Sequence, residues 1–430
     1  VGEKGSTSMG LNMTRPGGYF YIVGYGEEIK ILAVDVIFTE RNIIENLGYE
    51  NNILIGGTTG AWAFGTDTGA ILDREFNYVT PENDFKQRFI YPDNNSMFNW
   101  VQTDLWIQHI EENDQILRMH CPIGPQCSSW AKEDNRTSEE LTQNLIGFIS
   151  GICERYNHNE RIISMDVVNE TVHNGIWKGD LEGTDLWENP WVKIGYDNDI
   201  NSTPLYISMA FSLADSLCPN IKLIYNQHGS LINDLDDWEL IKETVLYLRE
   251  KGLRVDGIGW QAHVNYDWND NLNGDITPYN ELVEWSHSNN LEFHITEASV
   301  WIDDNSENSF EIQADVYSTI LLNLLDYHNT GIVGWNTWHI DDGHGWQTDR
   351  YPSLFDNNYI AKPAYYSIQS VLNNIQINGD INNDGEVNII DITQSISLIL
   401  NNQFNEFVDV NNDNMLNIID IVLLVNIILN

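Results

Sequence analysis

The sequence predicts an α/β protein whose main domain is a (β/α)8 barrel of the TIM type, followed by a small all-α module at the carboxyl terminus. Three observations carry this prediction. Strand-like runs alternate with longer helical runs eight times between residues 50 and 375. Polar residues of catalytic type gather where the strand-like runs end. Residues 376–430 contain no Lys or Arg and hold a duplicated loop rich in Asp and Asn.

The strand and helix patterns follow one another in the order that a barrel requires. The expected strands are 53–57, 76–83, 116–124, 163–170, 221–227, 255–264, 291–300 and 331–339. Helical apolar spacing marks 98–113, 139–156, 205–217, 237–251, 279–288, 310–328 and 363–374. A capping-box pattern at Thr137–Glu140 starts one of these helices. No glycine-rich fingerprint follows a strand, which disfavours a nucleotide-binding open sheet.

The expected strand ends share one feature, a polar or aromatic side chain suited to binding or catalysis. In a parallel barrel these ends meet at one face, where active sites are found. The sequence therefore predicts a site at that face built from Glu82, Asn83, His120, Asn169, Glu170, Asn226, Gln261, His263, Glu297 and Trp338.

The charge balance excludes several classes of function. With 64 acidic and 21 basic residues, the formal net charge is −43 at pH 7. Nucleic acids and anionic membrane surfaces would repel such a chain, so we expect neither as a partner. Hydrophobic residues make up 42% of the sequence, which excludes a disordered acidic tail. The longest apolar run, 418–429, is too short to span a bilayer, so we expect no membrane insertion.

Two further features leave alternatives open. Residues 1–49 read as a β-rich extension preceding the barrel domain at 50–375. The four cysteines, Cys121, Cys127, Cys153 and Cys218, lack the spacing of a metal site. They allow three disulfide pairings, of which Cys121–Cys127 closes the shortest loop, and free buried thiols are equally compatible with the sequence.

The duplicated loop in the module 376–430 has the oxygen spacing of a calcium site. Positions 1, 3, 5, 9 and 12 carry oxygen side chains, and position 7 offers a backbone carbonyl. Gly385 and Asn414 supply the sixth position, which needs a positive φ. Two bound Ca²⁺ are therefore predicted, with ligands Asp380, Asn382, Asp384, Glu386, Asn388 and Asp391 in the first repeat and Asp409, Asn411, Asp413, Met415, Asn417 and Asp420 in the second.

These repeats resemble a type I dockerin, the duplicated calcium module that attaches polysaccharide-degrading enzymes to a cohesin-bearing scaffold. The resemblance covers 379–430 and implies a cohesin or scaffold partner, secretion, and attachment to a cell-surface or scaffold assembly. One pair of positions departs from the pattern. Where many dockerins carry hydroxyl residues that contact the cohesin, this chain has Ile389-Ile390 and Ile418-Ile419. The partner surface is therefore expected to be apolar, or to pack against its own chain.

Two strand-end glutamates suit glycosidic bond hydrolysis. That reaction needs a proton for the leaving oxygen and a carboxylate at the anomeric carbon. Glu170 ends the fourth expected strand and Glu297 ends the seventh, so both face the barrel mouth. Asn169 can hydrogen-bond a sugar hydroxyl beside them. No cofactor is expected for catalysis.

The barrel region resembles glycoside hydrolase family 10, the retaining endo-β-1,4-xylanases. The matching segments are 76–86, 118–120, 165–170, 255–263, 294–297, 338–346, 352–356 and 362–366. The resemblance implies Glu170 as acid/base, Glu297 as nucleophile and His263 as the hydrogen-bond partner of Glu297. It also implies sugar contacts from Glu82, Asn83, Lys86, His120, Asn169, Gln261, Trp338 and Trp346.

The implied reaction is double displacement on β-1,4-xylan or a related plant or algal polysaccharide. Its geometry predicts about 5–5.5 Å between the two carboxyl groups. After His120 the chain departs from the family, which usually continues through a Trp-His pair. Here the run is 121–127, with Gly124 and Pro125 near those positions, so an aromatic wall is expected to be missing and the pocket to be open. The alternative interpretation is a non-catalytic carbohydrate-binding or structural assembly protein built on a degenerate barrel.

Overall fold

A computed structural model describes residues 52–180, 187–268, 276–373, 379–382, 387–411 and 415–429 of the chain. The predicted β-rich extension at 1–49 lies outside these residues.

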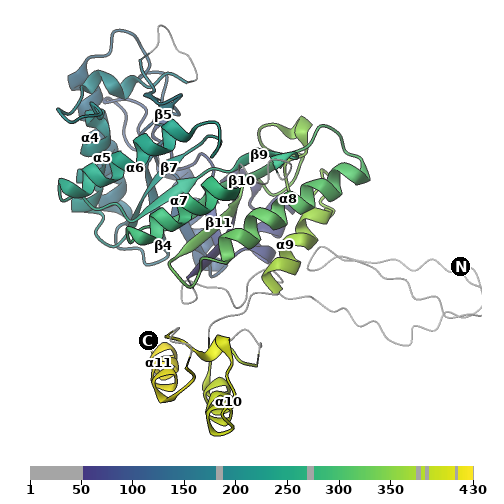
Figure 1. Ribbon diagram of the computed structural model, residues 1–430. Helices are drawn as coiled ribbons and strands as arrows, with labels where there is room; N and C mark the ends of the chain where they lie inside the picture. Colours follow the sequence, from purple (N-terminus) through teal and green to yellow (C-terminus); the bar gives the residue numbers. More distant parts are fainter. Residues whose placement is uncertain are drawn as a thin grey trace, which may run out of the picture.

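Eight parallel strands close into the predicted barrel (Figure 1). In order around it they are β1 (Ile53–Thr59), β2 (Tyr78–Pro81), β3 (Ile116–Met119), β4 (Ile162–Asn169), β7 (Lys222–Gln227), β8 (Gly257–Trp260), β10 (Glu292–Trp301) and β11 (Val333–Thr337). Pairing of β11 with both β10 and β1 closes the ring, which leaves no open edge. Beyond it, β9 (His263–Asn265) pairs with the end of β10, and β5 (Val172–His173) and β6 (Ile176–Trp177) form a small hairpin.

One helix of at least nine residues follows each barrel strand. These are α1 (Asp67–Glu75), α3 (Val101–Glu112), α4 (Ser138–Tyr156), α5 (Leu205–Leu217), α6 (Leu235–Glu250), α7 (Ile276–Ser288), α8 (Glu307–Leu325) and α9 (Pro363–Asn373). The capping box of Thr137 and Glu140 starts α4 as predicted. The sequence did not predict α1, because Gly69 lowers its helical propensity. Gly69 is required there, since a Cβ atom would lie 2.3 Å from the carbonyl oxygen of Ala63.

The barrel core is continuous and heavily aromatic. Buried apolar residues of the strands and of the inner helix faces form one cluster, in which Trp106, Trp191, Trp260 and Trp335 are among the largest fully buried side chains. Burial on both faces is typical of parallel strands covered by helices. Most residues of the described strands are accordingly buried, and the main cavity is lined by residues at the carboxyl ends of the strands.

A disulfide joins Cys153 on α4 to Cys218 at the end of α5. The pairing of Cys121 with Cys127 is not formed, and both of these thiols are free and buried. The loop 121–127 is therefore not held by a disulfide. Its packing against β4 holds it in place instead.

The carboxyl-terminal module is a helix pair, α10 (Ile389–Leu400) and α11 (Ile418–Leu429), which lie side by side (Figure 1). Its buried apolar cluster consists of Ile392, Val408, Ile421 and Leu424. An N-terminal cap from Asn388 and Asp391 starts α10. No helix in the described part of the chain is long and apolar enough to cross a bilayer.

Candidate active site

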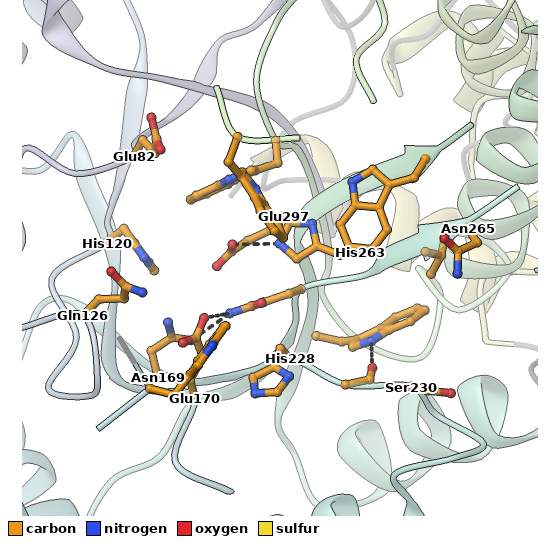
Figure 2. Close-up of a pocket in the computed structure, with 18 of the residues that line it drawn as sticks. Glu82, His120, Gln126, Asn169, Glu170, His228, Ser230, His263, Asn265 and Glu297 are labelled. Carbon is orange, nitrogen blue, oxygen red and sulfur yellow. Dashed lines mark hydrogen bonds and ion pairs between the residues drawn. The ribbon is translucent and has the colours of Figure 1, made fainter. Parts of the chain in front are cut away.

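A cavity of about 690 Å³ opens at the carboxyl ends of the barrel strands. The predicted site residues Glu82, Asn83, Lys86, His120, Asn169, Glu170, Gln261, His263, Glu297, Trp338 and Trp346 all line it. In Figure 2, Glu82, His120 and Gln126 lie to one side of Glu297, and Asn265 lies to the other. Glu170 and Glu297 thus lie within a cleft whose lining residues extend to both sides of Glu297.

Glu297 lies on β10, is 5% exposed and is held in the charged form. Its Oε1 accepts a hydrogen bond from Asn226 Nδ2 at 3.0 Å, and its Oε2 lies 3.3 Å from His263 Nε2. Burial alone would raise its pKa, but the hydrogen bond with His263 and the attraction of nearby basic side chains lower that pKa to about 2. The basic side chains are His120, His263 and Arg118.

Glu170 follows β4 directly and has a different environment. Its Oε1 accepts a hydrogen bond from Gln261 Nε2 at 3.0 Å, whereas its Oε2 is buried without a partner among the described residues. Its backbone is left-handed, with φ of 54°, a conformation that costs a non-glycine residue about 1 kcal/mol or more. The 3.3 Å bond from its amide to the Asn226 carbonyl oxygen helps to hold this turn. The turn directs the side chain back over the cavity.

Three amides connect the two carboxylates. Asn226 Nδ2 donates to Glu297 and also to Asn169 Oδ1. Gln261 Nε2 donates to Glu170 and to the same Asn169 oxygen. Both bonds to Asn169 Oδ1 are 3.1 Å long. Because Asn169 Oδ1 accepts both bonds, its Nδ2 is left to donate into the cavity. Asn226 was predicted at a strand end without a role. Its side chain extends from β7 and links Asn169 on β4 to Glu297 on β10.

On the side of Glu82, the predicted sugar contacts form a charged group. Lys86 is 7% exposed and donates a hydrogen bond to Asn83 Oδ1 at 3.1 Å. Burial, reinforced by the nearby Arg88, lowers the pKa of Lys86. His120 is fixed by Asp166, whose Oδ2 lies 2.6 Å from its Nδ1. These groups offer hydrogen-bond donors and acceptors to the hydroxyls of a sugar ring, in a site largely shielded from water.

Aromatic rings enclose His263. Trp301 is parallel to the imidazole at 5.8 Å, while Trp346 and Trp338 meet it edge-on at 5.2 and 6.4 Å. Trp346 remains 43% exposed, so part of its surface is open to a ligand. The sequence predicted the last two but not Trp301, because Trp301 reaches the cavity only through the extension of β10 beyond the barrel, where it pairs with β9.

The loop 121–127 packs closely against the end of β4. Ile123 pairs with Val168 of β4, and a Cβ atom on Gly124 would lie 2.3 Å from the carbonyl oxygen of Asn169. Trp191 donates a 3.1 Å hydrogen bond to the Gly124 carbonyl from beneath. An aromatic side chain is absent at Gly124, as predicted, and Gln126 is the loop residue that lines the cavity.

The family model described as Glycosyl hydrolase family 10 matches residues 44–371. This chain belongs to glycosyl hydrolase family 10. The family 10 domain is 31% identical over 322 residues to endo-1,4-beta-xylanase A of Caldicellulosiruptor saccharolyticus, an alignment covering 69% of this chain and 87% of that protein. It is 27% identical over 317 residues to endo-1,4-beta-xylanase A of Caldicellulosiruptor sp. (strain Rt8B.4), covering 69% of this chain but only 43% of that relative.

A solved structure supports the same relationship. Native xylanase 10B from Thermotoga maritima superposes with a TM-score of 0.64 at 28% identity, covering 75% of this chain and 96% of the xylanase. The TIM barrel of the family 10 domain is therefore shared with proteins of this family.

The model described as Dockerin type I domain matches residues 378–429, so the carboxyl-terminal module is a type I dockerin domain, a class that typically binds calcium. Of its predicted ligands, Asp384, Glu386 and Asp413 lie outside the described residues. Asp380, Asp391, Asp409 and Asp420 are at most 4% exposed, and Asn382, Asn388, Asn411, Met415 and Asn417 lie in the same two loops. Asp420 Oδ1 is buried without a protein partner in this part of the chain. Such buried carboxylates fit a cation site.

Proposed function

We propose that the family 10 domain is a retaining endo-1,4-β-xylanase that hydrolyses β-1,4-xylan by double displacement. One observation carries the proposal: a glutamate directly after β4 and a glutamate on β10 share one amide network, in which His263 and nearby basic side chains lower the pKa of Glu297, whereas one oxygen of Glu170 is buried without a partner among the described residues. A pair of carboxylates with different environments can divide the roles of nucleophile and acid. The names of the relatives supply the substrate class.

Glu297 is the proposed nucleophile. Its depressed pKa keeps it ionised throughout the neutral range, and the hydrogen bond with His263 fixes Oε2 while Asn226 holds Oε1. Attack on the anomeric carbon forms the covalent glycosyl-enzyme and expels the leaving oxygen. His263 therefore acts by orienting the nucleophile.

Glu170 is the proposed acid/base. Its unpartnered Oε2 is the oxygen that would carry a proton to the leaving oxygen, because the other oxygen already accepts the Gln261 amide. In the second half of the reaction the resulting carboxylate removes a proton from the attacking water. The retaining mechanism predicts about 5–5.5 Å between the carboxyl groups of Glu170 and Glu297.

The remaining cleft residues are proposed to hold the sugar chain. Asn169 Nδ2 faces the cavity beside both carboxylates, in position to donate to a hydroxyl of the reacting sugar. The rings of Trp338 and Trp346 offer apolar faces to the pyranose. The hydroxyl-binding set on either side is Glu82, Asn83, Lys86, His120 and Gln261.

A comparison of three polysaccharides tests this function. Wild-type protein should release reducing ends from β-1,4-xylan much faster than from β-1,4-glucan or β-1,4-mannan, with a mixture of oligosaccharides as early products. Glu297→Gln should release none above background, whereas Glu139→Gln, which alters an exposed glutamate at the start of α4, should match wild type. Equal rates for Glu297→Gln and wild type would support the non-catalytic alternative instead.

For the dockerin domain we propose two Ca²⁺ sites and a cohesin-type partner on an extracellular assembly. The carboxylate oxygens of the described aspartates would bind the ions, and the ions would supply the positive charge that compensates these buried carboxylates. Ile389, Ile390, Ile418 and Ile419 are 50–68% exposed and begin the two helices at matching positions. Since hydroxyl residues are absent there, the proposed partner presents an apolar surface to these isoleucines.

A further inference from the structure

Arg88 is a cation of the cleft that the proposed catalytic machinery does not use. It belongs to the short helix α2 (Gln87–Ile90), which follows β2, and it lines the same cavity as Glu82. Its Nη2 donates to Asn83 Oδ1 at 2.7 Å and its Nη1 donates to Gln126 Oε1 at 3.3 Å. The guanidinium is thus held by two neutral amides, one from the segment that follows β2 and one from the loop 121–127.

No carboxylate lies within ion-pair distance of Arg88 in the part of the chain that the structure describes. Other arginines of the barrel have one, among them Arg136, Arg155, Arg161 and Arg254. This contrast stands out in a chain with 64 acidic residues. Burial lowers the pKa of Arg88 and the negative charge of nearby Glu82 opposes that shift only in part, so a negative ligand would offset the remaining cost.

The loop 121–127 explains how this group is built. Because Gly124 packs against the backbone of Asn169, the loop presents no aromatic ring to the cleft at that position. It presents Gln126 instead, whose oxygen fixes the guanidinium. Gln126 lies beside His120 on the side of the cleft where Glu82 lies (Figure 2). The loop that departs from the family pattern at Gly124 is therefore also the loop that positions the Arg88 guanidinium through Gln126.

We propose that Arg88 binds the carboxylate of a uronic-acid branch on the substrate, on the sugars that contact Asn83 and Glu82. A guanidinium has five N–H donors, so two bonds to amides leave others for a ligand, and its planar shape matches a carboxylate. Pentose units of a xylan backbone carry no carboxylate, so the anion must belong to a branch. This inference rests on the proposed xylanase function for the identity of the backbone.

Two matched xylo-oligosaccharides test the proposal: one carries a single glucuronic-acid branch, and the other carries the same branch with its carboxyl group reduced to the alcohol. Their dissociation constants are measured by calorimetry on the Glu297→Gln protein, so the result does not depend on turnover. The acidic oligosaccharide should bind about tenfold more tightly, as expected for a charge-assisted contact. Adding Arg88→Met should remove that ratio, and Arg88→Lys should retain part of it.

Arg161→Met is the matched control. Arg161 forms an ion pair with exposed Asp114 and directly precedes β4, whereas the cleft lies at the other end of that strand. It should leave the ratio unchanged. Equal binding of the two oligosaccharides by the Glu297→Gln protein, or a ratio that survives Arg88→Met with an unaltered circular dichroism spectrum, would overturn the proposal. Failure of wild type to hydrolyse the neutral oligosaccharide would instead count against the xylanase function, while the binding ratio would still report on Arg88.

Discussion

The family 10 domain and the dockerin domain solve the same problem, the burial of carboxylates, in different ways. In the barrel, Glu297 is charged because protein groups surround it, with Asn226 and His263 bound directly. In the dockerin domain, Asp391 and Asp420 are fully buried in a helix pair whose cluster holds four buried apolar side chains among the residues that the structure describes. No Lys or Arg exists in 376–430 to compensate them.

The two regions obtain their order from different sources. A charge buried in a large core is tolerated when hydrogen bonds and cations are built into the fold. A small domain lacks enough apolar surface for this and depends on a bound ion. We therefore expect the barrel site to work without metal and the dockerin domain to require it.

The largest effect should come from the nucleophile. Glu297→Gln removes the attacking oxygen and should lower kcat on xylan by about 10⁴-fold or more, equal to ~5.5 kcal/mol of activation free energy. Glu170→Ala should lose a similar factor on xylan, but should retain much of its first step on an aryl xylobioside, because an acidic phenol leaves without protonation. Stopped-flow release of the phenol measures that step. A Glu297→Gln protein that releases phenol faster than Glu170→Ala would reverse the assigned roles.

Calcium removal should act on the other region alone. At millimolar Ca²⁺ and micromolar affinity, binding stabilises the dockerin domain by about 4 kcal/mol. Excess EDTA should therefore lower the melting temperature of the dockerin transition in calorimetry, and Asp420→Asn should weaken the recovery on adding Ca²⁺. The barrel transition and xylan hydrolysis should not change. Loss of hydrolysis in EDTA would mean that the two regions are not independent.

The disulfide should stabilise the barrel only. Cys153 and Cys218 are 65 residues apart in sequence. Because their bond restricts the unfolded chain, it should raise the free energy of unfolding by about 3–4 kcal/mol. The double variant Cys153→Ser, Cys218→Ser should lower the barrel melting temperature by several degrees and leave the dockerin transition in place. Cys121→Ser is the control, because it removes a free buried thiol and keeps the disulfide, so reduction of the disulfide should destabilise it as much as wild type.

The smallest of these effects is the pH dependence that Glu297 contributes to barrel stability. Its folded pKa of about 2 lies below the ordinary 4.5, so the stabilisation is present above pH 4.5 and is lost as the pH falls toward 2. That loss amounts to about 3 kcal/mol. Wild type should therefore lose more barrel stability than Glu297→Gln between pH 5 and pH 2.5 in melting experiments. Parallel acid profiles for the two proteins would contradict the depressed pKa.

The sequence predicted the strand ends well because one rule governs them. Every barrel strand points the same way, so residues such as Glu82, Asn169 and Glu297 had to meet at one face. Local signals also sufficed for the capping box at Thr137. These features depend on residue order and on periodicity, both of which are visible along the chain.

What the sequence could not give depends on contacts between distant segments. Arg88 meets Gln126 across 38 positions, and Trp301 reaches the cavity only because β10 continues past the barrel. The loop containing Gly124 packs against Asn169 and Trp191, which are 45 and 67 positions away in sequence. The disulfide of Cys153 was one of several pairings, since helix positions in space decide it.

The stereochemistry of the first product distinguishes double displacement from direct attack by water. Proton NMR spectra recorded within seconds to minutes of adding enzyme to a β-1,4-xylo-oligosaccharide distinguish the two anomers of the new reducing end before they equilibrate. Double displacement through Glu297 and Glu170 predicts that the β-anomer appears first and that the α-anomer grows in later by mutarotation. Initial accumulation of the α-anomer would contradict the account, because it would mean that water attacks directly and that Glu297 forms no covalent intermediate.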